Sequence, residues 1–153
     1  ASPAGPNAAG AAAGKVFAEI DALARHEGSA PETFAGLAGA GDLVATVMAD
    51  GSPQLTPVWI ERDGDTITFN TATGRVKWRN MRRDPRIALT VVDRDDDYAR
   101  VVVRGRVARM IEGEEADRQI DRLSKKYTGN DEYQGHKPGE SRVKVVVEPV
   151  SIR

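Results

Sequence analysis

From Leu43 to the end of the chain, short runs rich in Val, Ile and Thr alternate with polar stretches. These residue types fit the pleated surface of a sheet, so the pattern predicts strands. The dipeptides Asp50-Gly51 and Asp63-Gly64 separate the first three runs and are typical of hairpin turns, which predicts an antiparallel meander. Six strands are expected in all, over residues 43–49, 54–61, 66–70, 86–92, 99–110 and 143–147.

In three other segments, apolar residues recur every three or four positions, as Ile120 and Leu123 do near the C-terminus. This spacing places apolar side chains on one face of a helix. Gly41 follows the second segment and is expected to end its helix. The predicted helices cover residues 15–27, 31–40 and 113–126.

Residues 1–14 are nearly all Ala, Gly, Pro and Ser, which gives them little to bury, so we expect a mobile tail or an expression remnant. Residues 15–153 are enough for one domain with a single core. Strands without an alternating βαβ pattern, together with peripheral helices, predict an α+β fold whose antiparallel sheet curls into a small barrel. Long strands leave sheet edges, which a homodimer would cover.

Composition narrows the possible function. The chain has 153 residues, 29% of them charged, and a formal net charge of -1, which fits a globular protein better than a nucleic-acid binder. It has no cysteine, which excludes disulfides, thiolate metal sites and a cysteine nucleophile, and a cytoplasmic location is expected. No run is long enough to cross a membrane. The two histidines, His26 and His136, are far apart in sequence, so no metal site is predicted.

The segment TATGRVKWRNMRRDP, residues 71–85, is expected to form a polar loop that opens a short cationic helix. A helix N-terminus attracts anions, and this one carries Arg75 and Lys77 after the hydroxyls of Thr71 and Thr73. The pattern indicates a phosphate site. A solvated basic face is the alternative interpretation of the same charges.

The succession LVATVMADGSPQLTPVWI, FNTATGRVKWRNMRRDPRIALTVVD and YARVVVRGRVAR resembles the split β-barrel superfamily of pyridoxamine 5'-phosphate oxidase-like proteins, specifically its flavin/deazaflavin oxidoreductase branch. The resemblance covers residues 42 to about 152. It implies a six-stranded antiparallel FMN-binding split barrel with peripheral helices. It also implies a homodimer that binds FMN or the deazaflavin coenzyme F-420 at the subunit interface.

The resemblance also implies which residues contact the cofactor phosphate and the adjacent tail. The remaining arginines of the cationic helix are expected at the surface. The candidate positions are Arg75, Lys77 and Asn80, with Asn70, Thr71 and Thr73 just before them.

The segment QLTPVW contains a proline, which cannot donate to a sheet ladder and therefore marks an edge or a ligand-facing position. The resemblance implies that this strand lies against the flavin or deazaflavin ring. Because side chains alternate between the two faces, backbone groups must supply some of the contacts. The resemblance also implies an aromatic residue at the start of the fifth strand that reaches the partner's cofactor, where it could stack on the ring. The ring-contact candidates are Gln54, Thr56, Pro57, Val58, Trp59 and Tyr98, although Trp59 and Tyr98 also fit ordinary structural roles.

The sequence contains no Gly-x-Ser-x-Gly, phosphate-loop or Gly-x-Gly-x-x-Gly motif and no evident acid–base pair, so the catalytic residues are unknown. The cofactor would carry the chemistry. We expect an oxidoreductase that transfers a hydride between F-420 and a conjugated small molecule, because F-420 has an anionic tail that suits the cationic helix. An FMN-dependent oxidase or reductase and a non-catalytic cofactor- or tetrapyrrole-binding protein remain alternatives. Residues placed to shape a substrate pocket are Tyr127, Tyr133, Lys137 and Arg142.

Overall fold

The computed structural model describes residues 42–93 and 99–153, all of which lie in the unit Ala40–Arg153. Several expectations fall outside these residues and are not tested by the structure. They are the tail over 1–14, the helices over 15–27 and 31–40, and the position of Tyr98.

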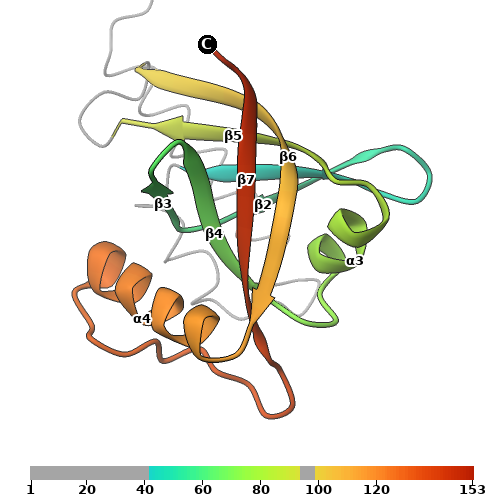
Figure 1. The fold of residues 1–153 in the computed structure, drawn as a ribbon. Coiled ribbons are helices and arrows are strands. Elements are labelled where there is room, and N and C mark those ends of the chain that lie inside the picture. The colour runs from blue at the N-terminus through green and yellow to red at the C-terminus, as the bar shows by residue number, and fades with distance from the viewer. Residues whose placement is uncertain (1–41, 94–98) are drawn as a thin grey trace, which may run out of the picture. The chain divides into compact units, whose positions relative to one another are not determined.

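Seven strands and two helices make up the described part of the chain. All paired strands are antiparallel, and the order across the sheet is β2-β1-β5-β6-β7-β4-β3. This arrangement confirms the predicted α+β class (Figure 1). The elements are β1 Leu43–Val47, β2 Pro53–Pro57, β3 Ile60–Asp63, β4 Thr66–Ala72, α3 Val76–Arg83, β5 Arg86–Val92, β6 Arg100–Glu112, α4 Glu114–Thr128 and β7 Arg142–Ile152.

The predicted strand over 54–61 is two strands, so the expected count of six was wrong for this sheet. β2 ends at Pro57 and β3 begins at Ile60, with Val58 and Trp59 between them. Proline has no N–H to continue the ladder with β1. β3 instead pairs with β4 at the other end of the sheet.

The connection between β2 and β3 explains why the sheet is curled. These strands lie at opposite ends of the strand order, yet only two residues separate them. Three Cα–Cα steps span at most about 11 Å. The sheet must therefore bend until its two edges come close, which produces a barrel.

The core fills the inside of this barrel. Phe69 of β4 pairs with Val145 of β7, and both side chains are fully buried among apolar neighbours such as Leu89 and Val103. Residues of β4 that alternate with Phe69 face α4 instead: the Gln119 amide donates to the Thr68 hydroxyl at 2.9 Å. One face of β4 thus belongs to the core and the other supports a helix.

The two helices lie on opposite sides of β7 in the view of Figure 1. α4 begins after Gly113 and ends before Gly129, whose φ of 82° is a left-handed conformation that favours glycine. It packs against β4, β6 and β7, whereas α3 packs against β1 and β4. α3 ends at Arg83 before Asp84 and Pro85. Its buried residues are Lys77, Asn80 and Met81, so a lysine lies on the inner face of this helix.

Candidate functional site

The N-terminus of α3 lies beside the segment that leads into β7. The Thr73 N–H donates to the Ser141 carbonyl at 2.9 Å, and the Ser141 N–H donates to the Thr73 hydroxyl at 3.3 Å. Next to this contact, Arg75 donates two hydrogen bonds to the Glu140 carboxylate, at 2.9 and 3.3 Å. Residues about 65 positions apart in the sequence therefore meet at the predicted phosphate site.

Lys77 is buried at this site, with 7% of its surface exposed. Within residues 42–93 and 99–153, no hydrogen bond or ion pair is made to its ammonium group. Burial, followed by the positive charges of Arg75 and Arg142, lowers the pKa of Lys77 from 10.5 to about 8. Such a position is unfavourable for a cation unless an anion joins it.

Arg142 is the third cation of the group and is 4% exposed. Its Nε donates to the Asn70 side-chain oxygen at 2.7 Å, and its guanidinium carbon lies 5.0 Å from the centre of the Tyr133 ring. Its Nη1 is buried without a hydrogen-bond partner in the described structure. Burial lowers the pKa of Arg142, although a guanidinium stays protonated at neutral pH. One buried donor of a permanent cation is thus left unsatisfied.

These residues, Arg75, Lys77, Arg142 and Glu140, are called the buried cation site below. Three cations act on one another there, and Glu140 is the one carboxylate that pairs with them among the described residues. The hydrogen bond from Arg75 is the main cause of a lowered pKa of Glu140, which therefore stays ionised. The site keeps an excess of positive charge, which suits an anion such as a phosphate.

Sequence reasoning placed Arg142 near a substrate pocket but did not assign it to the phosphate site. Its place follows from the ladder between β4 and β7, in which Ala72 is opposite Arg142 and Asn70 is opposite Lys144. Asn70 itself is fully engaged: its amide donates to Ala116 and Gln119, and its oxygen accepts from Arg142. Asn70 therefore orients Arg142 rather than offering a free group to a ligand.

Asn80 and Gln54 meet on the inner side of α3. The Asn80 amide donates to the Gln54 oxygen at 3.2 Å and to the Thr46 hydroxyl at 3.1 Å. Asn80 is 3% exposed, so these contacts fasten α3 to β1 and β2. Thr71 is also fully buried, on the core side of β4, and its hydroxyl oxygen has no partner among the described residues.

Trp59 connects the loop between β2 and β3 to the buried cation site through aromatic rings. It stacks on Tyr127 at 5.6 Å and meets the edge of Tyr133 at 5.9 Å, and Tyr133 in turn contacts Arg142. Tyr127 is fixed because its hydroxyl donates to Asp42 and accepts from the Ile60 N–H. Trp59 is therefore both a packing residue and part of the surroundings of Arg142.

The backbone donors of this loop differ in the partners that the described residues give them. Pro57 has no N–H, and the Val58 N–H donates to the Asp42 carbonyl at 3.1 Å. The Val58 side chain is 6% exposed and belongs to the core, while Thr56 and Pro57 are half-buried on β2. The Trp59 N–H has no acceptor within the part of the chain that the structure describes.

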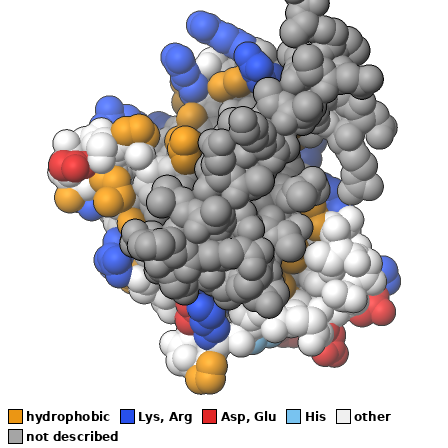
Figure 2. Space-filling view, turned by 180° about the vertical axis from the view of Figure 1, so that it is seen from behind, with side chains coloured by type: hydrophobic (Ala, Val, Ile, Leu, Met, Phe, Trp, Pro, Cys, Tyr) orange, Lys and Arg blue, Asp and Glu red, His pale blue; other side chains and the backbone are white. Residues whose placement is uncertain are grey.

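Charge elsewhere is more dispersed. On the face shown in Figure 2, Lys and Arg side chains lie at several separate places, with hydrophobic atoms between them. Among residues 42–93 and 99–153, no group of three or more His, Asp or Glu side chains is placed to hold a metal ion. His136 instead meets the edge of the Tyr133 ring at 5.2 Å. No helix in the described residues is long and apolar enough to cross a membrane.

The curled antiparallel sheet with peripheral helices defines an α+β split barrel. A family model described as pyridoxamine 5'-phosphate oxidase matches residues 43–153, and the chain belongs to this family. A second model, the C-terminus of NAD-dependent glycerol-3-phosphate dehydrogenase, matches residues 2–56, which is less than half of the chain. No curated protein sequence matches.

Solved structures agree with the family. An F-420 reductase has a TM-score of 0.63 and 31% sequence identity, over 73% of this chain and 87% of its own. A conserved hypothetical protein from Mycobacterium tuberculosis has a TM-score of 0.57 and 26% identity, over 73% and 74%. An FMN-binding protein from Syntrophomonas wolfei shares the fold, with a TM-score of 0.52 and 18% identity over 76% and 81%.

Proposed function

We propose that this protein is an oxidoreductase that binds a phosphate-bearing flavin or deazaflavin and transfers a hydride between it and a conjugated small molecule. One observation carries the proposal: within the described residues the buried guanidinium of Arg142 has an unsatisfied Nη1, and its charge acts on the buried ammonium of Lys77. An uncompensated buried charge costs several kcal/mol in a protein, which a bound anion would offset. A phosphate group fits these donors.

The residues present allow a division of roles. Lys77 and Arg142 would hold the phosphate, and Asn70 would keep Arg142 in place through its 2.7 Å hydrogen bond. Arg75 joins them when it exchanges Glu140 for the phosphate. The half-buried residues of β2 and the Trp59 N–H would meet the ring. When bound, the cofactor supplies the hydride chemistry, while the protein binds it, orients it and limits access of water.

F-420 is the cofactor that we favour. The similarity to an F-420 reductase at 31% identity supports this choice. The outer side of α3 also carries Arg79, Arg82 and Arg83, a basic surface that suits an oligoglutamate tail. Arg82 lies 4.7 Å from the Trp78 ring, which keeps its charge at the surface of the helix.

FMN is the second candidate, and the charge of the buried cation site favours it. Its phosphate is a monoester that carries close to two negative charges at neutral pH. Three cations and one carboxylate leave an excess of positive charge, which matches the two negative charges of such a phosphate. A third possibility is a protein that binds a cofactor or tetrapyrrole without turnover, since no proton donor has been assigned.

We also propose that two copies associate and that the cofactor lies between them. β2 is the last strand at one end of the sheet that the described residues form, and an edge strand favours pairing with another chain. Sedimentation equilibrium measures the association: a dimer supports this part of the proposal and a monomer at all concentrations overturns it.

Titration with the two cofactors is the main test. F-420 is expected to bind in the micromolar range, seen as a change in its absorbance or fluorescence. Binding of FMN without binding of F-420 would reverse the choice between them. The reduced cofactor is then mixed with a panel of enones and quinones. Oxidation of the cofactor supports an enzyme, whereas binding without oxidation by any acceptor supports the binding-protein alternative.

Lys77→Ala tests whether the buried cation site is the anchor. Loss of one charge-assisted hydrogen bond should weaken cofactor binding by about 1–3 kcal/mol without unfolding the domain. The exposed Lys125, which pairs with Asp131 at 2.8 Å, provides the matched control Lys125→Ala. If both variants are folded and bind the cofactor with equal affinity, Lys77 does not bind the phosphate and has only a structural role.

A further inference from the structure

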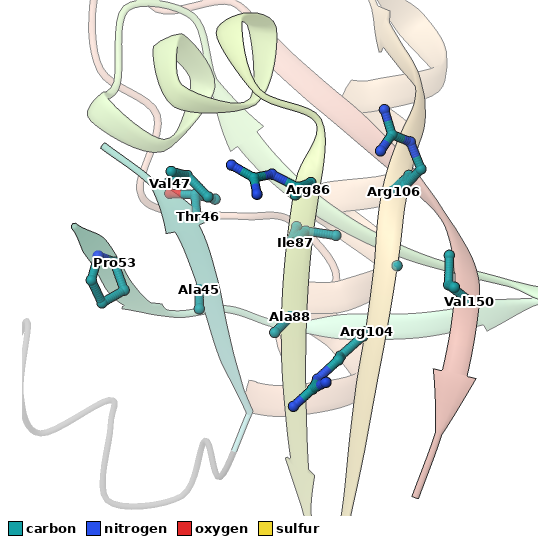
Figure 3. Close-up of a pocket in the computed structure, with 11 residues that line it drawn as sticks. Ala45, Thr46, Val47, Pro53, Arg86, Ile87, Ala88, Arg104, Arg106 and Val150 are labelled. Carbon is teal, nitrogen blue, oxygen red and sulfur yellow. The ribbon is translucent and has the colours of Figure 1, made fainter. Parts of the chain in front are cut away.

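A pocket of about 460 Å³ lies across β1, β5 and β6. None of the residues that line it was predicted to contact the cofactor. It is on the outer face of the sheet. Ala45 is opposite Ala88 in the ladder, and Ala88 is opposite Arg104. These residues alternate with core residues such as Leu89 and Val103, so their side chains point away from the barrel interior. Figure 3 shows this arrangement.

Small residues make the floor of the pocket. Ala45 and Ala88 have short side chains that point outward, and Gly105, which pairs with the core residue Ile87, lines the hollow with its backbone. A Cβ atom at Gly105 would lie 2.6 Å from the Glu148 carbonyl oxygen and 2.8 Å from a Val147 methyl group, so β6 and β7 approach too closely there for another residue. The apolar side chains of Val47, Pro53 and Val150 extend around this floor. The hollow is therefore built from the strands themselves.

Arginines form the polar part of the lining. Arg86 and Arg106 are directly opposite each other in the ladder between β5 and β6, a placement that is unfavourable for like charges. Arg86 pairs with Asp84 at 2.6 Å. For Arg104 and Arg106 no ion pair or hydrogen bond exists within the described residues. Glu148 is opposite Arg106 in the ladder between β6 and β7, and the charge of Arg106 acts on Asp84, but neither carboxylate forms an ion pair with Arg106 in the described structure. The two guanidinium groups thus stand beside an apolar hollow without a direct ion pair.

We propose that this pocket binds a small organic anion with a flat apolar body, an aryl carboxylate, whose carboxylate is held by Arg104 and Arg106. Guanidinium groups match carboxylates in geometry and charge, and the floor of small residues leaves room for a ring. A second copy of the chain that docked through this same face would bring its own arginines toward these, because an isologous interface uses one patch twice. Charge complementarity therefore favours a small anion as the occupant.

The binding of 2-naphthoate, measured by titration calorimetry, tests this site, with the neutral 2-naphthamide as a matched ligand. The carboxylate is expected to bind with a Kd below about 1 mM, and the amide at least tenfold more weakly. The double variant Arg104→Gln/Arg106→Gln should weaken 2-naphthoate binding at least tenfold. Arg109→Gln, an exposed arginine on the same strand outside the pocket, should change it less than twofold.

Ala88→Leu tests the floor without changing any charge, and it should also weaken 2-naphthoate binding at least tenfold. Thermal unfolding followed by circular dichroism checks that each variant is folded; if Ala88→Leu is not, the surface arginine variants decide. Equal binding of acid and amide, no binding by the unmodified protein, or unchanged binding in Arg104→Gln/Arg106→Gln overturns the proposal. So does a dimer that dissociates in these variants, which would make this face an interface between copies.

Discussion

Two regions of this barrel gather positive charge, and they differ in burial. In the buried cation site, Lys77 and Arg142 are 7% and 4% exposed, and one guanidinium nitrogen has no hydrogen-bond partner in the part of the chain that the structure describes. In the outer pocket, Arg104 and Arg106 are exposed to solvent. Water satisfies an exposed cation at little cost, whereas a buried one depends on what the protein or a ligand provides. The same residue types therefore indicate a bound anion strongly in the buried cation site and only weakly in the outer pocket.

The largest expected effect is that of Arg142→Met on cofactor binding. Loss of charge-assisted hydrogen bonds should cost about 2–3 kcal/mol, or a roughly 30- to 150-fold weaker Kd. Removal of an uncompensated buried charge favours the folded state, but it leaves the buried Asn70 oxygen without its donor, so the free energy of unfolding should fall by no more than about 1–3 kcal/mol. Cofactor titration and urea denaturation measure the two quantities.

Arg62→Met is the control for this change, because Arg62 is exposed and pairs with Asp65 at 3.9 Å. Binding and stability should both stay as in the unmodified protein. If Arg142→Met unfolds the domain, Arg142 is a structural residue, and if it binds the cofactor normally, the phosphate lies elsewhere.

The second prediction concerns pH. Because the pKa of Lys77 is about 8 in the folded chain and 10.5 is its ordinary value, the unfolded chain binds more protons between these values. The free energy of unfolding of the cofactor-free protein should therefore rise across that window, by up to about 3 kcal/mol from this group. A bound phosphate favours the charged ammonium, so cofactor affinity should fall as pH rises above 8.

The difference between the unmodified protein and Lys77→Met isolates this effect from other groups that titrate in the same range. Both pH dependences should be smaller in Lys77→Met, as measured by urea denaturation and cofactor titration at several pH values. Identical profiles for the two proteins would mean that Lys77 does not titrate in this window.

The buried cation site was predicted only in part from the sequence. Most of the strands, the cationic helix and the family motifs were predictable because they depend on local patterns. Arg142 and Glu140 were not assigned to the phosphate site, because only the pairing of β4 with β7 brings them to α3. The pattern also gave no sign that Lys77 faces inward, since a basic helix usually turns its charges to water.

The outer pocket was missed for a related reason. Its arginines lie on strands, where alternation predicts an ordinary solvent-facing row. The hollow appears only when Ala45, Ala88 and Gly105 become neighbours across three strands. The division of 54–61 into β2 and β3 likewise depends on closure of the barrel, which no local pattern encodes.

The third prediction removes a carboxylate from the buried cation site. Glu140 holds the guanidinium of Arg75 with two hydrogen bonds, so a phosphate must compete with it. Glu140→Gln should release Arg75 and tighten cofactor binding by about three- to tenfold. Weaker binding in this variant would instead make Glu140 a support that positions Arg75 for the ligand.

The smallest effect is expected from the equivalent change at the outer pocket. Asp84 pairs with Arg86 there, and Asp84→Asn keeps an acceptor for the Arg86 N–H while it removes the charge. Arg86 then becomes available to an anion, and 2-naphthoate should bind about two- to threefold more tightly, since exposed pairs contribute little. Glu114→Gln, which breaks the exposed pair with Arg118 on α4, should leave calorimetric binding unchanged. An effect as large as that of Glu140→Gln on the cofactor would contradict the comparison, because it would mean that burial does not set the strength of these two sites.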